Sequence, residues 1–271
     1  MEDRKEMAVK SLILLGDIPL ATKCLRMCLQ SPLVKVVGVI CMQESRRFKN
    51  DPWDEPCVYD YAHEQNLRIM TVEYVEEGFD ESELDIGFSC RASHILKPRF
   101  LSRFKKSVVN MHGGILPEMR GVHLACHSII EGWEEGGGTL HYMDEGIDTG
   151  PIIAERRFPI QRTDTAFSVY QKTQHALWTI FRENFDSILN DEERIISQQH
   201  LVDQGRKAQY FNMKALGKRK EINIQDMSLE EIDRHVRGCD FPGHEPAFFI
   251  YDGKKYYVTT LPFFQSEKSM D

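Results

Sequence analysis

Three polar side chains of this sequence have the types and spacing of a catalytic set for acyl transfer to an amine. Asn110 and His112 lie two residues apart where a β-branched run gives way to a glycine-rich loop. Residues two apart on a strand point to the same face, so the amide and the imidazole are expected to project together. Asp148 lies in a glycine-flanked turn from which its carboxylate can reach back to His112.

Each of these side chains has its own task when a neutral amine attacks a formyl carbon. The tetrahedral intermediate carries an oxyanion, which a fixed amide N–H such as that of Asn110 stabilises. The attacking nitrogen must lose a proton, and histidine, with an ordinary pKa of about 6.5, titrates in the useful range. A carboxylate beside the imidazole fixes its tautomer and favours the imidazolium, which is the task expected of Asp148.

Alternating strand and helix patterns predict the scaffold that holds these residues. Helical spacing is present at 20–29 and 58–65. Strands are expected at 11–15, 34–40, 67–72, 86–90, 107–111, 139–143 and 151–156. This order indicates an α/β, Rossmann-like fold with a mostly parallel wound sheet, whose ligands bind beyond the carboxyl ends of the strands.

The last part of the chain is expected to form a small separate subdomain. We place the catalytic domain at 1–203 and a C-terminal subdomain at 204–271. Within the second, a helix is expected at 229–237, followed by a hairpin of strands 247–251 and 256–261 joined by an Asp-Gly turn.

Two local expectations concern the end of the catalytic domain. Gly136, Gly137 and Gly138 are expected to form a tight connection into the next strand, and a long amphipathic helix is expected over 164–189 with Thr163 or Asp164 as its N-cap.

Composition excludes several classes of protein. The 271 residues include 34 Lys and Arg against 42 Asp and Glu, a net charge of −8, which disfavours a nucleic-acid partner. No apolar run approaches the roughly 20 residues of a membrane span, and the charged start has no signal-peptide core. We therefore expect a cytoplasmic protein with no membrane partner.

Neither the cysteines nor the remaining histidines predict a metal site. The seven cysteines contain no CxxC pair and are expected to be buried, reduced thiols. His123 and His127 have an i, i+4 spacing, but no third ligand with suitable spacing follows. No metal is expected.

The motifs resemble those of a known family. The spacing of Asn110, His112, Leu116-Pro117, Arg120-Gly121 and Asp148-Thr149-Gly150 is similar to that of the folate-dependent formyltransferases. This resemblance implies N10-formyltetrahydrofolate as the co-substrate. It also implies that Asn110 is the oxyanion donor, His112 the base and Asp148 the orienting carboxylate.

Within that family the sequence most resembles the sugar-nucleotide N-formyltransferases. Gly114 stands where the tRNA and purine enzymes usually carry Ser, and residues 201–271 hold 11 basic and 11 acidic side chains, unlike the basic C-terminal domain of the tRNA enzymes. Met119 departs from the aromatic residue common in the sugar enzymes. The implied acceptor is a nucleotide-linked amino sugar, such as a dTDP- or GDP-linked 4-amino-4,6-dideoxyhexose. The implied enzyme is a homodimer that serves lipopolysaccharide O-antigen biosynthesis.

The resemblance also implies two binding sites. Pteridine needs backbone partners at its edges and apolar cover on its faces. The candidate folate residues are Arg91, Ser93, Ile95, Leu96, Ile115, Leu116, Met143, Asp144, Gly146 and Ile147. A sugar diphosphate needs cationic or hydroxyl partners. The candidates for that group are Arg91, Lys97, Tyr210 and Lys214.

Other interpretations remain open at this point. The chain could be a formyltetrahydrofolate hydrolase, in which water replaces the amine, a methionyl-tRNA formyltransferase-like enzyme, or a folate- or nucleotide-binding protein without catalysis. His112 could be a core histidine, and Asp148 could simply cap a turn. His141, inside an expected strand, is interpreted as structural rather than catalytic. The basic run 214–220 is interpreted as a solvated surface.

Overall fold

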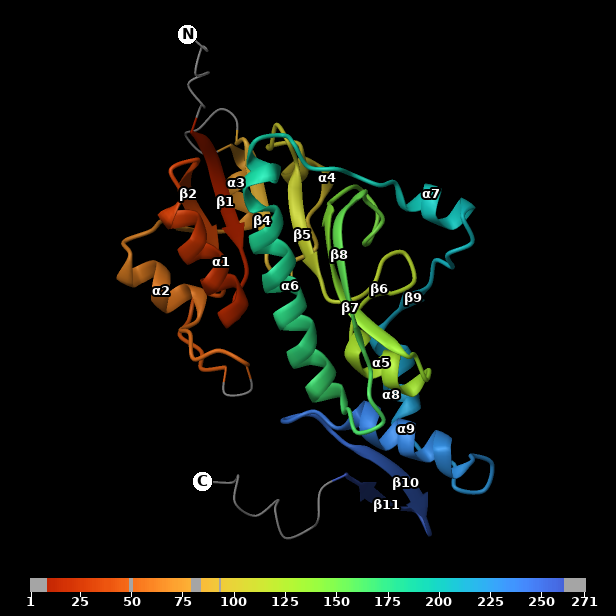
Figure 1. Cartoon of the computed structure of the whole chain (residues 1–271). Helices are drawn as coiled ribbons and strands as arrows, with labels where there is room; N and C mark the ends of the chain where they lie inside the picture. The colour runs from red at the N-terminus through yellow and green to blue at the C-terminus, as the bar shows by residue number, and fades with distance from the viewer. Residues whose placement is uncertain (1–8, 49–50, 79–83, 93, 261–271) are drawn as a thin grey trace.

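The computed structural model describes residues 9–48, 51–78, 84–92 and 94–260 (Figure 1). In these residues the strands are β1 (Lys10–Leu15), β2 (Val34–Ile40), β3 (Ile69–Met70), β4 (Ile86–Ser89), β5 (Val108–His112), β6 (Arg120–Gly121), β7 (Glu135–Tyr142), β8 (Ile152–Pro159), β9 (Tyr210–Phe211), β10 (Ala247–Tyr251) and β11 (Lys254–Val258). The helices are α1 (Pro19–Gln30), α2 (Val58–Glu64), α3 (Val72–Glu77), α4 (Pro98–Leu101), α5 (Leu124–Ile130), α6 (Ala166–Leu189), α7 (Gln198–Asp203), α8 (Met213–Arg219) and α9 (Leu229–Cys239).

The central sheet has the strand order β3-β2-β1-β4-β5-β7-β8. Strands β1 to β5 pair in parallel, whereas β7 runs antiparallel to both β5 and β8. From β1 the chain adds β2 and β3 on one side of the sheet, and it then returns to add β4 and β5 on the other side of β1. This reversal creates the switch point at which wound sheets bind their ligands. The predicted α/β fold with a mostly parallel sheet is confirmed.

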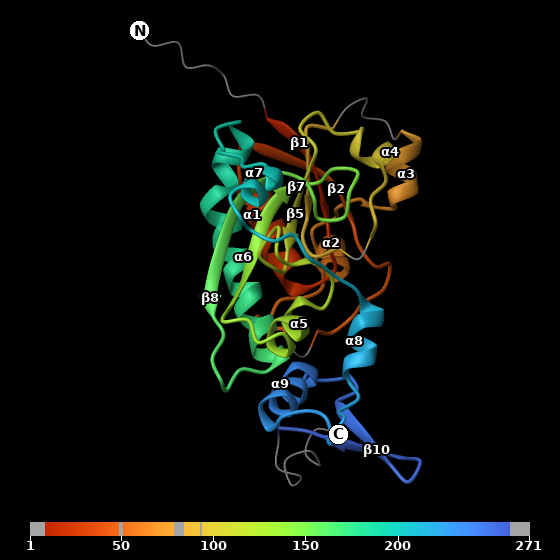
Figure 2. The same ribbon diagram turned by 90° about the vertical axis from the view of Figure 1, so that its right-hand side faces the viewer.

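The residues of β1 show why this strand forms the middle of the molecule. Leu12 and Leu14 point into a cluster with α1, α2 and α6, whereas Ile13 and Leu15 point into a second cluster with α3 and α4. All four side chains are buried, as is typical of parallel strands that helices cover on both faces. Figure 2 shows the resulting layers, with α6 on the left of the sheet and α3 and α4 on the right.

The C-terminal elements pack on the end of α5 rather than on the sheet. Apolar side chains of α5, α8, α9 and β10 form a separate cluster. In Figure 1 these elements lie below the sheet. Strands β10 and β11 form the predicted hairpin, and its turn residues Asp252 and Gly253 both have left-handed backbone conformations. Its second strand ends at Val258, and position 261 of the predicted strand lies outside the described residues.

The three consecutive glycines do not form the predicted connection, because they lie inside β7. A Cβ atom at Gly138 would come within 2.7 Å of Leu177 of α6, and one at Gly137 would lie 2.8 Å from Ile115. Glycine in a strand often marks such a close approach by another element. Gly138 lets α6 lie directly on the strand that carries His141, and Gly137 makes room for Ile115.

Two other boundaries also differ from expectation for local reasons. Helix α6 is capped by Thr165, whose side chain accepts from the amide of Ser168, and not by Thr163 or Asp164. The strand expected at 67–72 is confined to Ile69–Met70, because Thr71 caps the start of α3. Within the described residues, no helix has the length and apolarity needed to cross a bilayer.

Candidate active site

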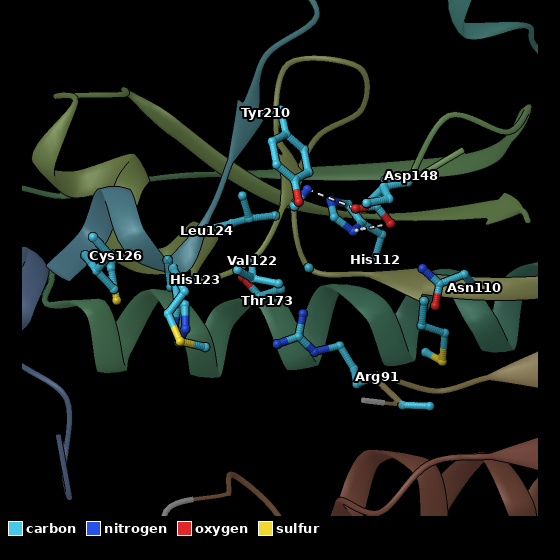
Figure 3. Close-up of a pocket in the computed structure, with 18 of the residues that line it drawn as sticks. Arg91, Asn110, His112, Val122, His123, Leu124, Cys126, Asp148, Thr173 and Tyr210 are labelled. Atoms are coloured by element: carbon cyan, nitrogen blue, oxygen red, sulfur yellow. Dashed lines mark hydrogen bonds and ion pairs between the residues drawn. The ribbon is translucent and has the colours of Figure 1, made fainter. Parts of the chain in front are cut away.

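The structure brings Asn110, His112 and Asp148 together at the carboxyl end of β5 (Figure 3). All three line a cavity of about 580 Å³. Nδ1 of His112 lies 3.4 Å from Oδ1 of Asp148. The cavity size is within the range of small-molecule sites, and an amide, an imidazole and a carboxylate meet at its rim.

Contacts on both sides of Asp148 fix its carboxylate. Its backbone has a left-handed conformation with φ of 54°, and its Oδ2 accepts from the amide of Gly121 at 2.9 Å. Gln198, which is buried, donates to the carbonyls of Asp148 and Gly150 at 2.9 and 2.8 Å. Gln198 also accepts from the guanidinium of Arg120. This clamp holds the catalytic turn, and nothing in the sequence pattern pointed to Gln198.

The ring of His112 is held from its far side. Nε2 lies 2.5 Å from the carbonyl oxygen of Met119, which can only accept, so this nitrogen carries a proton. Nδ1 faces Asp148 and can donate to its carboxylate only when it also carries a proton, that is, in the imidazolium. Burial alone would raise the pKa of Asp148, but the hydrogen bond and charge of His112, together with the Gly121 amide, lower it to about 2.

A second histidine completes the cluster. Asn110 and His141 are paired across β5 and β7, and Nδ2 of Asn110 lies 3.1 Å from Nε2 of His141. Nδ1 of His141 lies 2.9 Å from the carbonyl of Tyr142. Burial, followed by the charge of His112, lowers the pKa of His141 to about 4, so the ring is neutral near pH 7. The prediction that His141 is purely structural did not include this contact with Asn110, which only the strand register shows.

The donor atoms of His112, His141 and Asp148 lie within 4.8 Å of one another, close enough to hold a metal ion. Other contacts already engage them, since His141 hydrogen-bonds to Asn110 and Nδ1 of His112 lies at ion-pair distance from Asp148. The geometry therefore requires no ion, and the absence of a metal from the reaction stays a prediction.

Most of the predicted folate residues surround the cavity. Those that line it are Arg91, Ile95, Leu96, Met143, Asp144, Gly146 and Ile147. Ser93 lies outside the described residues. Ile115 and Leu116 do not line the cavity, because Ile115 is buried with Met119 and Leu124 and the side chain of Leu116 is fully buried. These two residues support the catalytic loop from behind.

Only two of the four residues predicted to bind the diphosphate line the cavity. Arg91 and Tyr210 line the cavity, whereas Lys97 precedes α4 and Lys214 lies on α8, both exposed and outside the lining. Tyr210 reaches the site because β9 pairs with β6 beside the catalytic loop. Lys220, from the basic run interpreted as a solvated surface, lines the cavity instead.

Arg91 has an unusual setting at the cavity wall. Its backbone is left-handed with φ of 60°, and a Cβ atom at Gly113 would lie 2.0 Å from its Nη1 atom. Glycine at position 113 thus makes room for the guanidinium. Burial lowers the pKa of Arg91, although Tyr170 and Asp148 favour its charged form.

Other basic groups share this side of the cavity. Burial lowers the pKa of His123, and the charges of His244, Lys220 and Arg91 lower it further, so its imidazole is a neutral hydrogen-bonding group beside the two permanent cations Arg91 and Lys220. All four line the cavity. A wall of this kind favours an anionic part of a ligand.

Comparisons with known proteins identify the family to which the chain belongs. Residues 13–183 match the family described as formyl transferase. The GDP-perosamine N-formyltransferase of Brucella melitensis is 31% identical over 211 residues, which cover 74% of this chain and 76% of that protein. The chain therefore belongs to the formyl transferase family, and the predicted membership is confirmed.

Within the family the chain is most similar to the sugar enzymes. The crystal structure of a sugar 3N-formyl transferase, in the presence of dTDP and 5-N-formyl-THF, superposes with a TM-score of 0.72 at 25% identity, covering 92% of this chain and 85% of that one. The methionyl-tRNA formyltransferase of Desulforamulus reducens is 27% identical over 240 residues, which cover 86% of this chain and 73% of that protein. At 27% identity against 31% for the GDP-perosamine enzyme, the tRNA enzyme is the more distant relative.

Proposed function

We propose that this protein transfers the formyl group of N10-formyltetrahydrofolate to the amino group of a nucleotide-linked amino sugar, such as a dTDP- or GDP-linked 4-amino-4,6-dideoxyhexose. The observation that carries the proposal is the meeting of Asn110, His112 and Asp148 at the rim of one cavity. The similarity to a GDP-perosamine N-formyltransferase and to a sugar 3N-formyl transferase supports the choice of acceptor.

The three residues act together on the attacking amine. The amine nitrogen forms a bond to the formyl carbon, and Asn110 donates an N–H to the oxyanion that develops. His112 accepts the proton that this nitrogen loses, and Asp148, 3.4 Å away, stabilises the resulting imidazolium. The bond between the formyl carbon and N10 then breaks, and the proton passes to N10, so that the products are a formamide and tetrahydrofolate.

The cavity has separate surfaces for the two substrates. We place the pteridine between the loop that contains Ile95 and Leu96 and the turn from Met143 to Ile147, which together offer apolar side chains and backbone polar groups. We place the diphosphate at the wall where Arg91 and Lys220 supply positive charge and His123 supplies a neutral hydrogen-bonding imidazole.

Residues 201–271 argue against the tRNA alternative. They hold 11 basic and 11 acidic side chains, so this part of the chain lacks the excess positive charge with which proteins grip a phosphate backbone. The hydrolase alternative shares the same three polar residues and differs only in the nucleophile. A separate test is therefore needed for it.

Several finer features belong to the same proposal. We place the boundary between the catalytic domain and the C-terminal subdomain at residues 203 and 204, and we propose a cytoplasmic homodimer that serves O-antigen biosynthesis. Support for the dimer comes from the β10-β11 hairpin, on which Ile250, Tyr251 and Tyr257 are more than half exposed.

The proposal is tested by incubating the protein with the formyl donor and a panel of dTDP-, UDP- and GDP-linked amino sugars. Mass spectrometry should detect a formamide product with one of them, and tetrahydrofolate should form in equal amount. Release of formate at the same rate without any acceptor would instead identify a hydrolase.

A further inference from the structure

His141 has a hydrogen-bonding pattern that determines which of its nitrogens carries a proton. Its Nδ1 lies 2.9 Å from the carbonyl oxygen of Tyr142, and a carbonyl can only accept. Nδ1 therefore carries the proton. Burial in β7, with 1% of the residue exposed, keeps the ring uncharged, and its pKa is lowered to about 4. A neutral ring with a proton on Nδ1 has a lone pair on Nε2.

This lone pair faces the amide of Asn110. The separation of 3.1 Å is that of a hydrogen bond, so the amide atom beside His141 must be the donor, Nδ2, and not the oxygen. Asparagine can present either its oxygen or its nitrogen to a ligand by rotating its amide by half a turn, and only the nitrogen can donate to an oxyanion. The orientation of Asn110 thus determines whether the site stabilises the transition state.

We infer that His141 is a positioning residue that fixes the amide of Asn110 with its nitrogen toward the reacting carbonyl. One N–H of Nδ2 is held by Nε2 of His141, and the other is left for the oxyanion. The inference rests on the proposed function, in which Asn110 is the oxyanion donor. It assigns His141 a role in transition-state stabilisation that a purely structural histidine would not have.

The first test is a double-mutant cycle with formyl transfer as the readout. His141→Leu removes the acceptor and fills most of the space of the ring, and we expect kcat to fall by about 10- to 100-fold, while KM for both substrates changes by less than about 3-fold. His141→Gln can still accept through its Oε1 atom and should retain more activity. In the Asn110→Ala background, His141→Leu should cause almost no further loss, since the group that it positions is gone. Equal losses in both backgrounds would overturn the inference.

The second test needs no activity and uses the wild-type protein. Nitrogen NMR of ¹⁵N-histidine-labelled protein, with the His141 signals assigned by comparison with His141→Gln, should show a protonated Nδ1 and an unprotonated Nε2 near pH 7. A protonated Nε2 would overturn the inference even if His141→Leu fails to fold. Failure of the wild type to formylate any amino sugar would contradict the proposed function instead, and would leave the NMR result unchanged.

Discussion

Nδ1 of His112 lies 3.4 Å from Oδ1 of Asp148, while Nε2 of the same ring lies 2.5 Å from the carbonyl of Met119. The carbonyl fixes the proton on Nε2, so Nδ1 is the nitrogen that can exchange a proton at the reacting centre. The Gly121 amide, in turn, holds the other carboxylate oxygen of Asp148. Rigid partners therefore hold both members of the pair before any substrate binds.

This pairing predicts the effect of removing the charge of Asp148. Asp148→Asn keeps the size of the side chain but cannot stabilise the imidazolium, so we expect kcat to fall by about 100-fold or more, as is usual when acid–base catalysis is impaired. Asp186→Asn, an exposed change on α6, is the matched control and should retain wild-type kcat. Steady-state kinetics with a competent acceptor check this, and a loss below about 3-fold would contradict the role of Asp148.

The close approach of Gly113 to Arg91 predicts a substitution that weakens substrate binding without lowering the stability of the fold. Gly113→Ala places a Cβ 2.0 Å from the Arg91 Nη1 atom, at the flexible end of that side chain, so the guanidinium must move while the fold persists. We expect KM for the nucleotide sugar to rise by about 10-fold, because one charge-assisted contact to the diphosphate is weakened. The melting temperature should change little.

Gly217→Ala is the control for that experiment. Gly217 lies on exposed α8, and no atom lies within 4 Å of its added Cβ, so the change should leave KM as it is and stabilise the helix by up to about 1 kcal/mol. An unchanged KM in Gly113→Ala would contradict the placement of Arg91 at the diphosphate site.

The clamp formed by Gln198 predicts a loss of stability when this side chain is replaced. Gln198→Leu leaves the carbonyls of Asp148 and Gly150 without their donor and Arg120 without its acceptor. We expect a loss of about 2 to 3 kcal/mol in the free energy of unfolding, since buried polar groups lose their partners. Urea denaturation measures this loss. The neighbouring exposed Gln199→Leu should stay within about 0.5 kcal/mol of the wild type, and equal effects at both positions would contradict the clamp.

Buried His127 predicts how stability depends on pH. The ring packs against Phe211, and burial lowers its pKa to about 4, below the ordinary value of 6.5. The unfolded chain therefore binds a proton more readily than the folded chain between these values, and stability falls as the pH drops from about 6.5 to about 4, by up to roughly 3 kcal/mol for this residue.

His127→Leu should flatten that part of the pH profile. Urea denaturation at several pH values between neutral and about 4 provides the measurement. His200→Leu, a change at an exposed position on α7, should leave the slope unchanged. A slope that is the same in the wild type and in His127→Leu would show that His127 does not titrate in this way.

The sequence predicted the wound sheet and the polar trio because both depend on local pattern. Strand spacing places Asn110 and His112 on one face, and the turn chemistry around Asp148 is visible in its glycines. The contact between His141 and Asn110 depends instead on the antiparallel register of β5 and β7, which no local pattern specifies.

Contacts between distant segments were likewise invisible in the sequence. Gln198 reaches the catalytic turn from α7, and Lys220 reaches the cavity because the C-terminal elements pack against α5. Ile115 and Leu116 have the apolar character of ligand contacts, yet tight packing behind the loop buries them. Apolar residues beside a site serve the core or the ligand, and only tertiary packing distinguishes the two.

The most direct test of the account is transfer of a labelled formyl group from N10-formyltetrahydrofolate by the wild-type protein and by His112→Gln. We expect the wild type to place the label on the amine of a nucleotide-linked sugar, and His112→Gln to lose nearly all of this activity. Label that appears only as free formate, or a His112→Gln variant as active as the wild type, would contradict it.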